Sequence, residues 1–199
     1  MVVTVLTVLI SYLLGSVSFS ILIAKWVKGI DIRNYGSGNA GATNTLRVLG
    51  KGPGIAVFLL DIAKGIVAVI LGIYAAGGDW GPALCGLAAI AGHNWPVWFG
   101  FKGGKGIATT VGVMASLAIV PTLVAGVVAI VSIAITRFVS LGSLIFALLV
   151  PIFIWNFGDK PQSYVWAALV ICLLAFVRHR TNIVKLMQGK ENKLGARKG

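Results

Sequence analysis

Long runs of apolar residues, separated by short polar and glycine-rich loops, make up most of the chain. Seven runs are nearly free of charge and predict membrane-spanning helices at residues 2–24, 55–76, 82–99, 107–120, 121–136, 138–157 and 164–177. Several runs are shorter than the roughly 20 residues with which a helix crosses a bilayer. The fourth and fifth runs are either one helix kinked at Pro121 or two short helices that meet there.

The basic residues decide between these alternatives, because cytoplasmic loops carry an excess of Lys and Arg. Two separate helices give seven spans and place 15 of the 17 basic residues on one side. These 15 residues are Lys25, Lys28, Arg33, Arg47, Lys51, Lys102, Lys105, Arg137, Arg178, Arg180, Lys185, Lys190, Lys193, Arg197 and Lys198. We therefore expect an all-α integral membrane protein with seven transmembrane helices, its N-terminus outside and its C-terminus in the cytoplasm.

Composition agrees with a membrane protein, since 58% of the residues are hydrophobic and only 11% are charged. A soluble domain carries about 25% charged residues. The net charge of +12 would suggest nucleic acid as the partner of a soluble protein. In a membrane protein the positive-inside rule explains the excess, so we expect no nucleic-acid partner and one transmembrane domain over residues 1–199.

The first polar loop, YGSGNAGATNTLR at residues 35–47, combines glycines with hydrogen-bond donors. Glycines let backbone N–H groups converge on an anion, and the guanidinium of Arg47 can bind a phosphate through two N–H groups. The alternative is an ordinary polar turn, in which Gly, Ser and Asn are common. Many donors and few acids favour an anion site. Its expected members are Ser37, Asn39, Gly41, Thr43, Asn44 and Arg47.

The second loop reads GHNWPVWFGFKGGKGIATT at residues 92–110. Its glycines and lysines precede a predicted helix, whose unpaired N–H groups and dipole favour an anion. The pattern is not a nucleotide-binding P-loop, because Phe99 and Gly106 stand where Gly and Ser or Thr belong. The lysines could instead only mark topology, but the interleaved glycines favour an anion site. Its expected members are Gly103, Gly104, Lys105 and Gly106.

A third segment, RHRTN at residues 178–182, ends the last apolar run. It is either a stop-transfer signal or a site, and His179 and Asn182 would share one face of a continuing helix. The apolar residues Ile183, Leu186 and Met187 follow among lysines, so we expect a short C-terminal helix on the membrane surface.

Charged groups inside the membrane are costly and usually paired. Asp61 and Lys64 lie three residues apart inside the second run, and we expect a structural ion pair there more than direct chemistry. The chain has five acidic residues, too few near the loops to hold Mg²⁺ or Zn²⁺, so we expect no metal and no cofactor. No Ser-His-Asp set is visible, and Trp98 and Val184 replace the Asp of a His-x4-Asp acyltransferase signature.

Five segments together resemble the PlsY family, the acyl-phosphate-dependent glycerol-3-phosphate acyltransferases of the bacterial inner membrane. The segments are SGNAGATNTLRVLGKGPG (37–54), LLDIAKG (59–65), GHNWPVWFGFKGGKGIATT (92–110), RFVSLGS (137–143) and HRTNIVKLMQGKENK (179–193). The resemblance implies transfer of a fatty acyl group from acyl phosphate to the 1-hydroxyl of glycerol 3-phosphate. The products would be lysophosphatidate and inorganic phosphate.

The resemblance also implies an active site that faces the cytoplasm, with Ser37, Arg47 and Lys105 acting on phosphate groups. His179 and Asn182 would orient the glycerol, and Ser140 and Ser143 are weaker binding candidates. The proton acceptor is either His179 or a substrate phosphate, and the lack of a carboxylate beside His179 favours the phosphate. Membrane lipids are expected partners and a monomer is the simplest expectation, although the sequence leaves the oligomeric state and the acyl-chain preference open.

A membrane transporter of an organophosphate is the alternative function, because basic anion sites in a helical bundle would suit it too. Transporters usually bind their substrate near the midplane of the membrane, between repeated halves of the fold. Here the candidate loops fall on one predicted face and no internal repeat is visible, which favours the enzyme.

Overall fold

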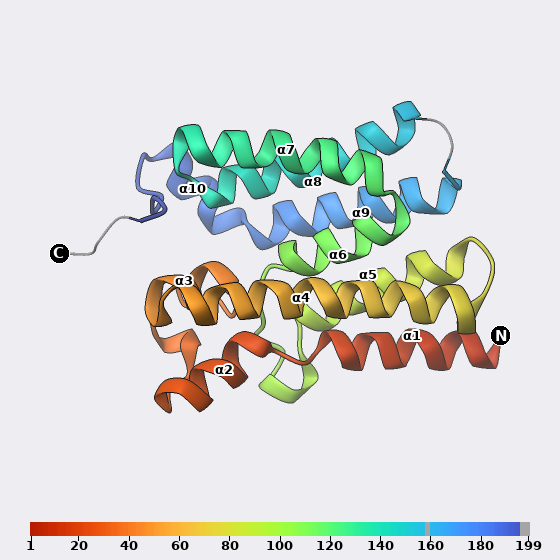
Figure 1. The fold of residues 1–199 in the computed structure, drawn as a ribbon, viewed down its shortest axis with the longest axis horizontal. Coiled ribbons are helices and arrows are strands. Elements are labelled where there is room, and N and C mark those ends of the chain that lie inside the picture. The colour runs from red at the N-terminus through yellow and green to blue at the C-terminus, as the bar shows by residue number, and fades with distance from the viewer. Residues whose placement is uncertain (158–159, 196–199) are drawn as a thin grey trace. The chain divides into compact units, whose positions relative to one another are not determined.

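The computed structural model of the protein describes residues 1–157 and 160–195, and every regular element within these ranges is helical (Figure 1). The all-helical expectation is therefore confirmed for this part of the chain. Arg197 and Lys198 of the predicted basic tail lie outside the described residues. The chain forms two compact units, Met1–Leu117 and Ala118–Gly199, called here the first and the second unit.

The first unit contains six α-helices and three short helical turns. They are α1 (Val2–Gly15), α2 (Phe19–Lys28), η1 (Ile32–Asn34), α3 (Ala42–Leu49), α4 (Lys51–Leu71), η2 (Gly72–Ala76), α5 (Trp80–Asn94), η3 (Val97–Phe99) and α6 (Ile107–Leu117). The second unit contains α7 (Ile119–Thr136), α8 (Val139–Phe157), α9 (Gln162–Arg178) and α10 (Arg180–Met187).

Glycines let the helices of the first unit approach closely. Helix α1 packs against α5, and α4 packs against α6 and α3. A Cβ atom added at Gly15 would overlap the backbone of Ala89, and one added at Gly65 would overlap the carbonyl oxygen of Thr109. Small residues at such crossings are typical of helix packing in membranes, where dispersion contacts replace the hydrophobic drive.

The first apolar run is not the single helix predicted over residues 2–24. Helix α1 ends at Gly15 and α2 begins at Phe19, with Ser18 in an extended conformation between them. The break leaves backbone groups without a helical partner, and the Val17 carbonyl accepts a hydrogen bond from Lys64 Nζ of α4 at 3.1 Å. A buried side chain from another helix thus stabilises the interruption, which local sequence alone does not reveal.

The fourth and fifth runs form two helices, with the break at Ala118 and not at Pro121. Ala118 has φ −151° and ψ 79°, outside the helical region, and α7 begins at the next residue. Pro121 lies in the first turn of α7, where its missing N–H group costs no intrahelical hydrogen bond. Helix α6 belongs to the first unit and α7 to the second.

In the second unit, α8 packs against both α7 and α9 (Figure 1). Gly142 of α8 lies against Ala129 and Ile133 of α7, at a point where a Cβ atom would overlap the Ile133 side chain. Helices α9 and α10 meet at His179 with a bend of 60°. The short C-terminal helix predicted from the sequence is present as α10, and its place on a membrane surface stays a prediction.

Four segments of the described chain are long and apolar enough to cross a membrane, and the bent pair α9 and α10 would make a fifth. The four are Val2–Lys28, Lys51–Ala76, Ile119–Thr136 and Val139–Phe157. Large apolar side chains such as Leu123, Val127 and Ile130 of α7 are mostly exposed, as expected for a surface that faces lipid. The other predicted spans correspond to α5, with 15 residues, and α6, with 11.

Candidate functional site

The side chain of Asn44 holds the first glycine-rich loop in shape. Its Oδ1 atom accepts the Ser37 N–H at 2.8 Å, and its Nδ2 atom donates to the carbonyls of Tyr35 at 3.0 Å and Ile32 at 3.2 Å. Asn44 is buried, and Gly36, at φ 63°, lies so close that a Cβ atom would overlap the amide. These contacts assign Asn44 to the architecture of the loop, beside the substrate-binding role expected from the sequence.

Three backbone N–H groups of this loop, those of Ser37, Gly38 and Gly41, are used within the loop itself. Beside Ser37, the Gly38 N–H donates to the Tyr35 carbonyl at 3.0 Å and the Gly41 N–H donates to the Asn39 carbonyl at 3.1 Å. These groups therefore do not converge on an anion in the way expected from the glycines. The loop presents side chains instead. Ser37 and Arg47 are exposed, and Asn39 and Thr43 are half-buried.

The glycine turn, residues 102–106, folds back on the end of α5. The Gly103 N–H donates to the Asn94 carbonyl at 3.3 Å, and the Gly104 N–H donates to the His93 carbonyl at 3.1 Å. The main contribution of these two glycines is that, without side chains, they let the turn pack closely against α5. A Cβ atom at Gly103 would overlap the His93 carbonyl, and one at Gly104 would overlap His93 Nε2 and the Ala40 carbonyl.

Helix α6 begins directly after the glycine turn, as the sequence predicts. Gly106 has φ 82°, a conformation that favours glycine, and its carbonyl accepts the Thr110 N–H at 2.7 Å. Lys105 is half-buried at this helix start. Two features of the turn favour a negatively charged ligand, the ammonium of Lys105 and the positive end of the α6 dipole, and the anion site itself stays a prediction.

The two loops meet within the first unit, because Ala40 lies against Gly104. Arg33 of η1 adds a second connection that the sequence analysis missed. Its Nη1 atom donates to the Phe99 carbonyl at 2.7 Å and to the Lys102 carbonyl at 3.4 Å, while Nε and Nη2 bind the carboxylate of Asp31. An open pocket of about 760 Å³ lies between η1 and the glycine turn.

The Asp31–Arg33 ion pair keeps both groups charged. Hydrogen bonding to the Arg33 guanidinium lowers the pKa of the Asp31 carboxyl below its ordinary value, and the carboxylate raises the pKa of Arg33. In the sequence, the Asp-x-Arg spacing indicates only the ion pair itself. Phe99, which Arg33 contacts on the second loop, is 66 residues further along the chain.

In the second unit, a backbone carbonyl determines which nitrogen of His179 carries a proton. His179 is buried, and its Nδ1 atom lies 2.8 Å from the Ala175 carbonyl oxygen. A carbonyl oxygen only accepts hydrogen bonds, so Nδ1 is the donor and the lone pair of the neutral ring is on Nε2. The sequence shows no carboxylate for this role, and the preceding turn of α9 supplies a carbonyl instead.

Glu191 connects three parts of the second unit and was not singled out from the sequence. Its Oε1 atom accepts hydrogen bonds from Ser140 Oγ at 2.9 Å and from Asn182 Nδ2 at 2.8 Å. The segment that carries Glu191 is fixed by Arg137, whose guanidinium donates to the Leu194 carbonyl at 2.8 Å. Asn182 and Ser140 are thereby brought to one carboxylate. In the sequence, Glu191 lies in the GKENK stretch, which ends the last of the five segments that resemble the PlsY family.

The predicted residues thus fall into two sets, one in each unit. The first set is Ser37, Asn39, Gly41, Thr43, Asn44, Arg47, Gly103, Gly104, Lys105 and Gly106. The second set is Ser140, Ser143, His179 and Asn182. Within the second set, Ser143 Oγ bonds only one turn back, to the Val139 carbonyl at 2.9 Å, so its contact does not join it to Glu191.

The predicted ion pair inside α4 is present. Asp61 Oδ1 lies 2.8 Å from Lys64 Nζ, and both side chains are 1% exposed. Among the residues that the structure describes, no three His, Cys, Asp or Glu side chains gather closely enough to hold a metal ion.

The fold and its apolar segments define an integral membrane protein, and comparison with known proteins gives its family. Residues 5–189 match the family described as Glycerol-3-phosphate acyltransferase. The chain belongs to this family. It is 58% identical to the glycerol-3-phosphate acyltransferase of Shouchella clausii (strain KSM-K16), over 95% of each chain. It is 55% identical to that of Halalkalibacterium halodurans, over 97% of this chain and 96% of the relative.

Two crystal structures of PlsY (YgiH), an integral membrane glycerol 3-phosphate acyltransferase, are similar to this fold. The glycerol 3-phosphate form is 41% identical over 96% of each chain, with a TM-score of 0.91. The lysophosphatidic acid form is 40% identical over 96% of this chain and 95% of the other, with a TM-score of 0.89. The family resemblance inferred from the five sequence segments is confirmed.

Proposed function

We propose that this protein transfers a fatty acyl group from acyl phosphate to the 1-hydroxyl of glycerol 3-phosphate, giving lysophosphatidate and inorganic phosphate. The observation that carries the proposal is the likeness, over nearly the whole chain, to a solved acyltransferase in its glycerol 3-phosphate and lysophosphatidic acid forms. An acyl phosphate donor accounts for a site rich in anion-binding groups, because both substrates then carry a phosphate.

In this reaction the glycerol oxygen attacks the acyl carbon, and the bond from that carbon to the phosphate oxygen breaks. The hydroxyl proton moves to an acceptor and the phosphate leaves as an anion. An acyl phosphate has a good leaving group, so no covalent enzyme intermediate is needed. Positioning of the two substrates and neutralisation of phosphate charge would supply most of the catalysis.

We assign Arg47, Ser37 and Lys105 to phosphate contacts, with Asn39, Gly41, Thr43 and Gly106 around them. Arg47 carries a planar fork that suits bidentate binding, and Lys105 carries a compact charge beside a helix start. Asn44, Gly103 and Gly104 support the same contacts by shaping the loops. The half-buried and exposed positions of the charged side chains are consistent with a site open to a water-soluble substrate.

His179 and Asn182 act on the glycerol part of the substrate in this proposal, with Ser140 and Ser143 nearby on α8. The Nδ1–H form of His179 offers Nε2 as an acceptor for a glycerol hydroxyl. A substrate phosphate remains our choice of proton acceptor, and the departing phosphate suits this role because it gains basicity as its bond to the acyl carbon breaks. His179 is the competing proton acceptor, because its Nδ1–H tautomer has a lone pair on Nε2. Variants of His179 distinguish these two acceptors.

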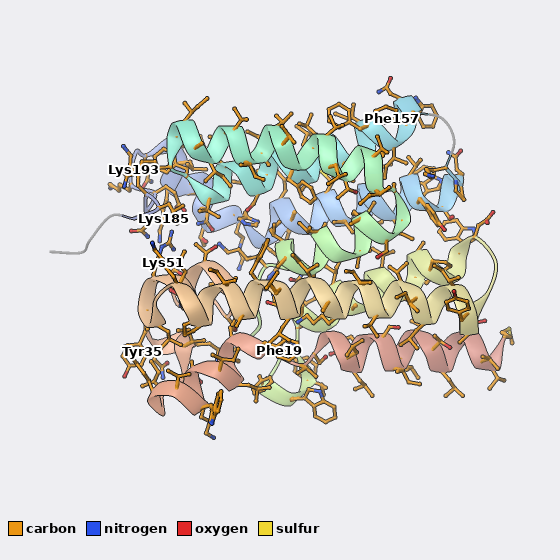
Figure 2. All side chains as sticks on the ribbon, in the orientation of Figure 1. Phe19, Tyr35, Lys51, Phe157, Lys185 and Lys193 are labelled. Carbon is orange, nitrogen blue, oxygen red and sulfur yellow. The ribbon has the colours of Figure 1, made fainter. Side chains whose placement is uncertain are left out.

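We further propose seven membrane crossings in the bacterial inner membrane, with the N-terminus outside and the site facing the cytoplasm. In the first unit, Tyr35 and Lys51 lie at the end opposite Met1, and in the second unit Lys185 and Lys193 lie at the end opposite Phe157 (Figures 1 and 2). The labelled basic side chains, Lys51 in the first unit and Lys185 and Lys193 in the second, therefore each lie at one end of their unit, which supports a cytoplasmic assignment for these ends. We expect α10 to lie on the membrane surface.

Both sets of residues serve one reaction in this proposal, so we expect the chain to work as a single acyltransferase domain, as a monomer within membrane lipids. The test uses full-length protein purified in detergent, with glycerol 3-phosphate and a long-chain acyl phosphate. Formation of lysophosphatidate and phosphate in equal amounts is the expected result. Uptake of glycerol 3-phosphate into sealed proteoliposomes, without acylated product, would show that the protein is a transporter and not an acyltransferase.

A further inference from the structure

A buried cluster of ionisable groups lies in the first unit and has no part in the proposed chemistry. It consists of Asp61 and Lys64 of α4 and His93 of α5. The three side chains are at most 5% exposed. Buried charges are costly in a membrane protein unless they are paired, and those that persist usually have a function. The ion pair explains how Asp61 and Lys64 are tolerated, but it does not explain why an imidazole joins them.

The contacts of Lys64 determine the protonation of His93. Lys64 Nζ lies 2.8 Å from Asp61 Oδ1, 3.1 Å from the Val17 carbonyl and 2.9 Å from His93 Nδ1. An ammonium has three N–H donors and no acceptor, and its nitrogen lies closer to His93 Nδ1 than Asp61 Oδ1 does, at 2.9 Å against 3.5 Å. We therefore take His93 Nδ1 as the acceptor from Lys64, which gives a neutral ring with its proton on Nε2. The ring of Phe19, which is labelled in Figure 2, has its centroid 5.8 Å from Nζ, and the face of an aromatic ring attracts an ammonium.

The Nε2 side of His93 faces the junction of the two glycine-rich loops. A Cβ atom added at Gly104 would overlap both His93 Nε2 and the Ala40 carbonyl, so these two atoms lie against the same point of the glycine turn. The backbone of His93 also accepts the Gly104 N–H at 3.1 Å. An Nε2–H group is compatible with a nearby carbonyl oxygen, whereas the lone pair of the other tautomer would repel it.

We propose that His93 is a positioning residue for acyl transfer. The Asp61–Lys64 pair holds its imidazole neutral with the proton on Nε2, and the ring in turn fixes Gly104 against Ala40 and sets the direction of Lys105. The catalytic part of this inference rests on the proposed function, because Lys105 is assigned to a substrate phosphate there. The tautomer and the packing of the turn do not depend on it.

The first test measures the tautomers of the two histidines in full-length protein labelled with nitrogen-15 histidine. His93 should give the spectrum of an Nε2–H ring and His179 that of an Nδ1–H ring, assigned with His93→Gln and His179→Gln. Lys64→Met should convert His93 to a ring protonated on Nδ1, because the Asp61 carboxylate, 3.5 Å away, becomes its nearest charged group. An imidazolium or an Nδ1–H ring at His93 in the unaltered protein at neutral pH would overturn the inference.

The second test measures kcat and KM for both substrates. His93→Asn keeps an acceptor for Lys64 but loses the ring at Gly104, and it should lower kcat/KM on the order of 10²-fold, the cost of a small misplacement of a catalytic group. The KM of the one substrate whose phosphate meets Lys105 should rise and the other KM should not. His93→Gln, which keeps a donor near Nε2, should lose less activity.

Ser11→Ala is the matched control, because Ser11 is a buried polar residue of α1 in the same unit and has no place in the site. Its kinetics should match those of the unaltered protein. If His93→Asn and His93→Gln lose equal activity and both KM values are unchanged, His93 contributes only to folding and the positioning proposal is overturned. An unaltered protein with the predicted tautomers but no acyltransferase activity would reject the proposed function and leave the tautomer result standing.

Discussion

The imidazole of His179 has its protonation chosen by a single backbone carbonyl, that of Ala175. If a substrate phosphate takes the hydroxyl proton, the ring only accepts a hydrogen bond at Nε2, and the amide oxygen of His179→Gln can accept one too. We expect this variant to keep appreciable activity with an unaltered pH profile, and His179→Ala to keep less. Steady-state rates between pH 5.5 and 8.5 make the comparison.

A His179→Gln variant that is inactive at every pH would instead identify His179 as the base. Loss of a general base lowers the rate by about 10²–10⁴-fold. The unaltered enzyme would then lose activity at acidic pH along a single ionisation that the variant lacks. Asn182→Ala has no titrating proton to lose, so it should weaken the use of glycerol 3-phosphate and leave the shape of the profile alone.

Arg47 and Lys105 should not tolerate exchange for each other's residue type. Arg47→Lys loses the planar fork that binds two phosphate oxygens, and Lys105→Arg brings a larger group into a turn packed against His93 and Ala40. Both variants should lose most of kcat/KM while remaining folded. Near-normal kcat/KM in both would mean that neither residue touches a reacting phosphate, and that the two loops mark topology only.

Among the elements, the glycine turn gives a prediction with a built-in control. Gly104→Ala should displace the turn, because its Cβ atom would overlap His93 Nε2 and the Ala40 carbonyl. Gly52→Ala places the same methyl group in α4, where nothing lies within 4 Å. We expect Gly104→Ala to lose most activity and Gly52→Ala to keep it with equal or higher Tm, since Ala is favoured over Gly in helices. Similar activity in both variants would contradict the packing described for the turn.

The Arg33 connection between η1 and the second loop should depend on pH in one direction. Because the pKa of Asp31 is lowered in the fold, the ion pair stabilises above the ordinary Asp pKa of about 3.9 and the effect is lost as pH falls through the lowered value. The side chains are 27% and 34% exposed, so we expect at most about 1 kcal/mol. The Tm difference between the unaltered protein and Arg33→Met should therefore shrink in acid, and a difference that grows there would contradict this account.

The elements also show what a sequence can reveal. Glycine and lysine spacing located the turn at residues 102–106 and the start of α6, because both depend on local conformation. The break between α1 and α2 was missed, since the group that stabilises it, Lys64, lies 47 residues beyond Val17. Glu191 was missed for the same reason, as its partner Ser140 is 51 residues away. The three candidate segments could be identified from local sequence, but the contacts that orient their side chains join residues far apart in the chain.

At the scale of the whole molecule, the seven-span topology can be tested by labelling. Single cysteines placed at Asp79 and at Gly195, in a protein with Cys85 and Cys172 replaced by Ala, should react from opposite sides of sealed inner-membrane vesicles. The expectation follows from the gathering of basic residues on one predicted face. Labelling of both positions from the same side would contradict the seven-span topology. Positions in the loop 35–41 should react together with Gly195.

The hydrogen bond from Lys64 to Val17 couples the interrupted first segment to the buried cluster. Replacing Lys64 alone removes the partner of a carbonyl, of a carboxylate and of an imidazole at once. Effects of substitutions at these positions should therefore be strongly non-additive. We therefore expect that a related protein without this lysine also lacks the aspartate and has an unbroken first helix, so that the three features change together.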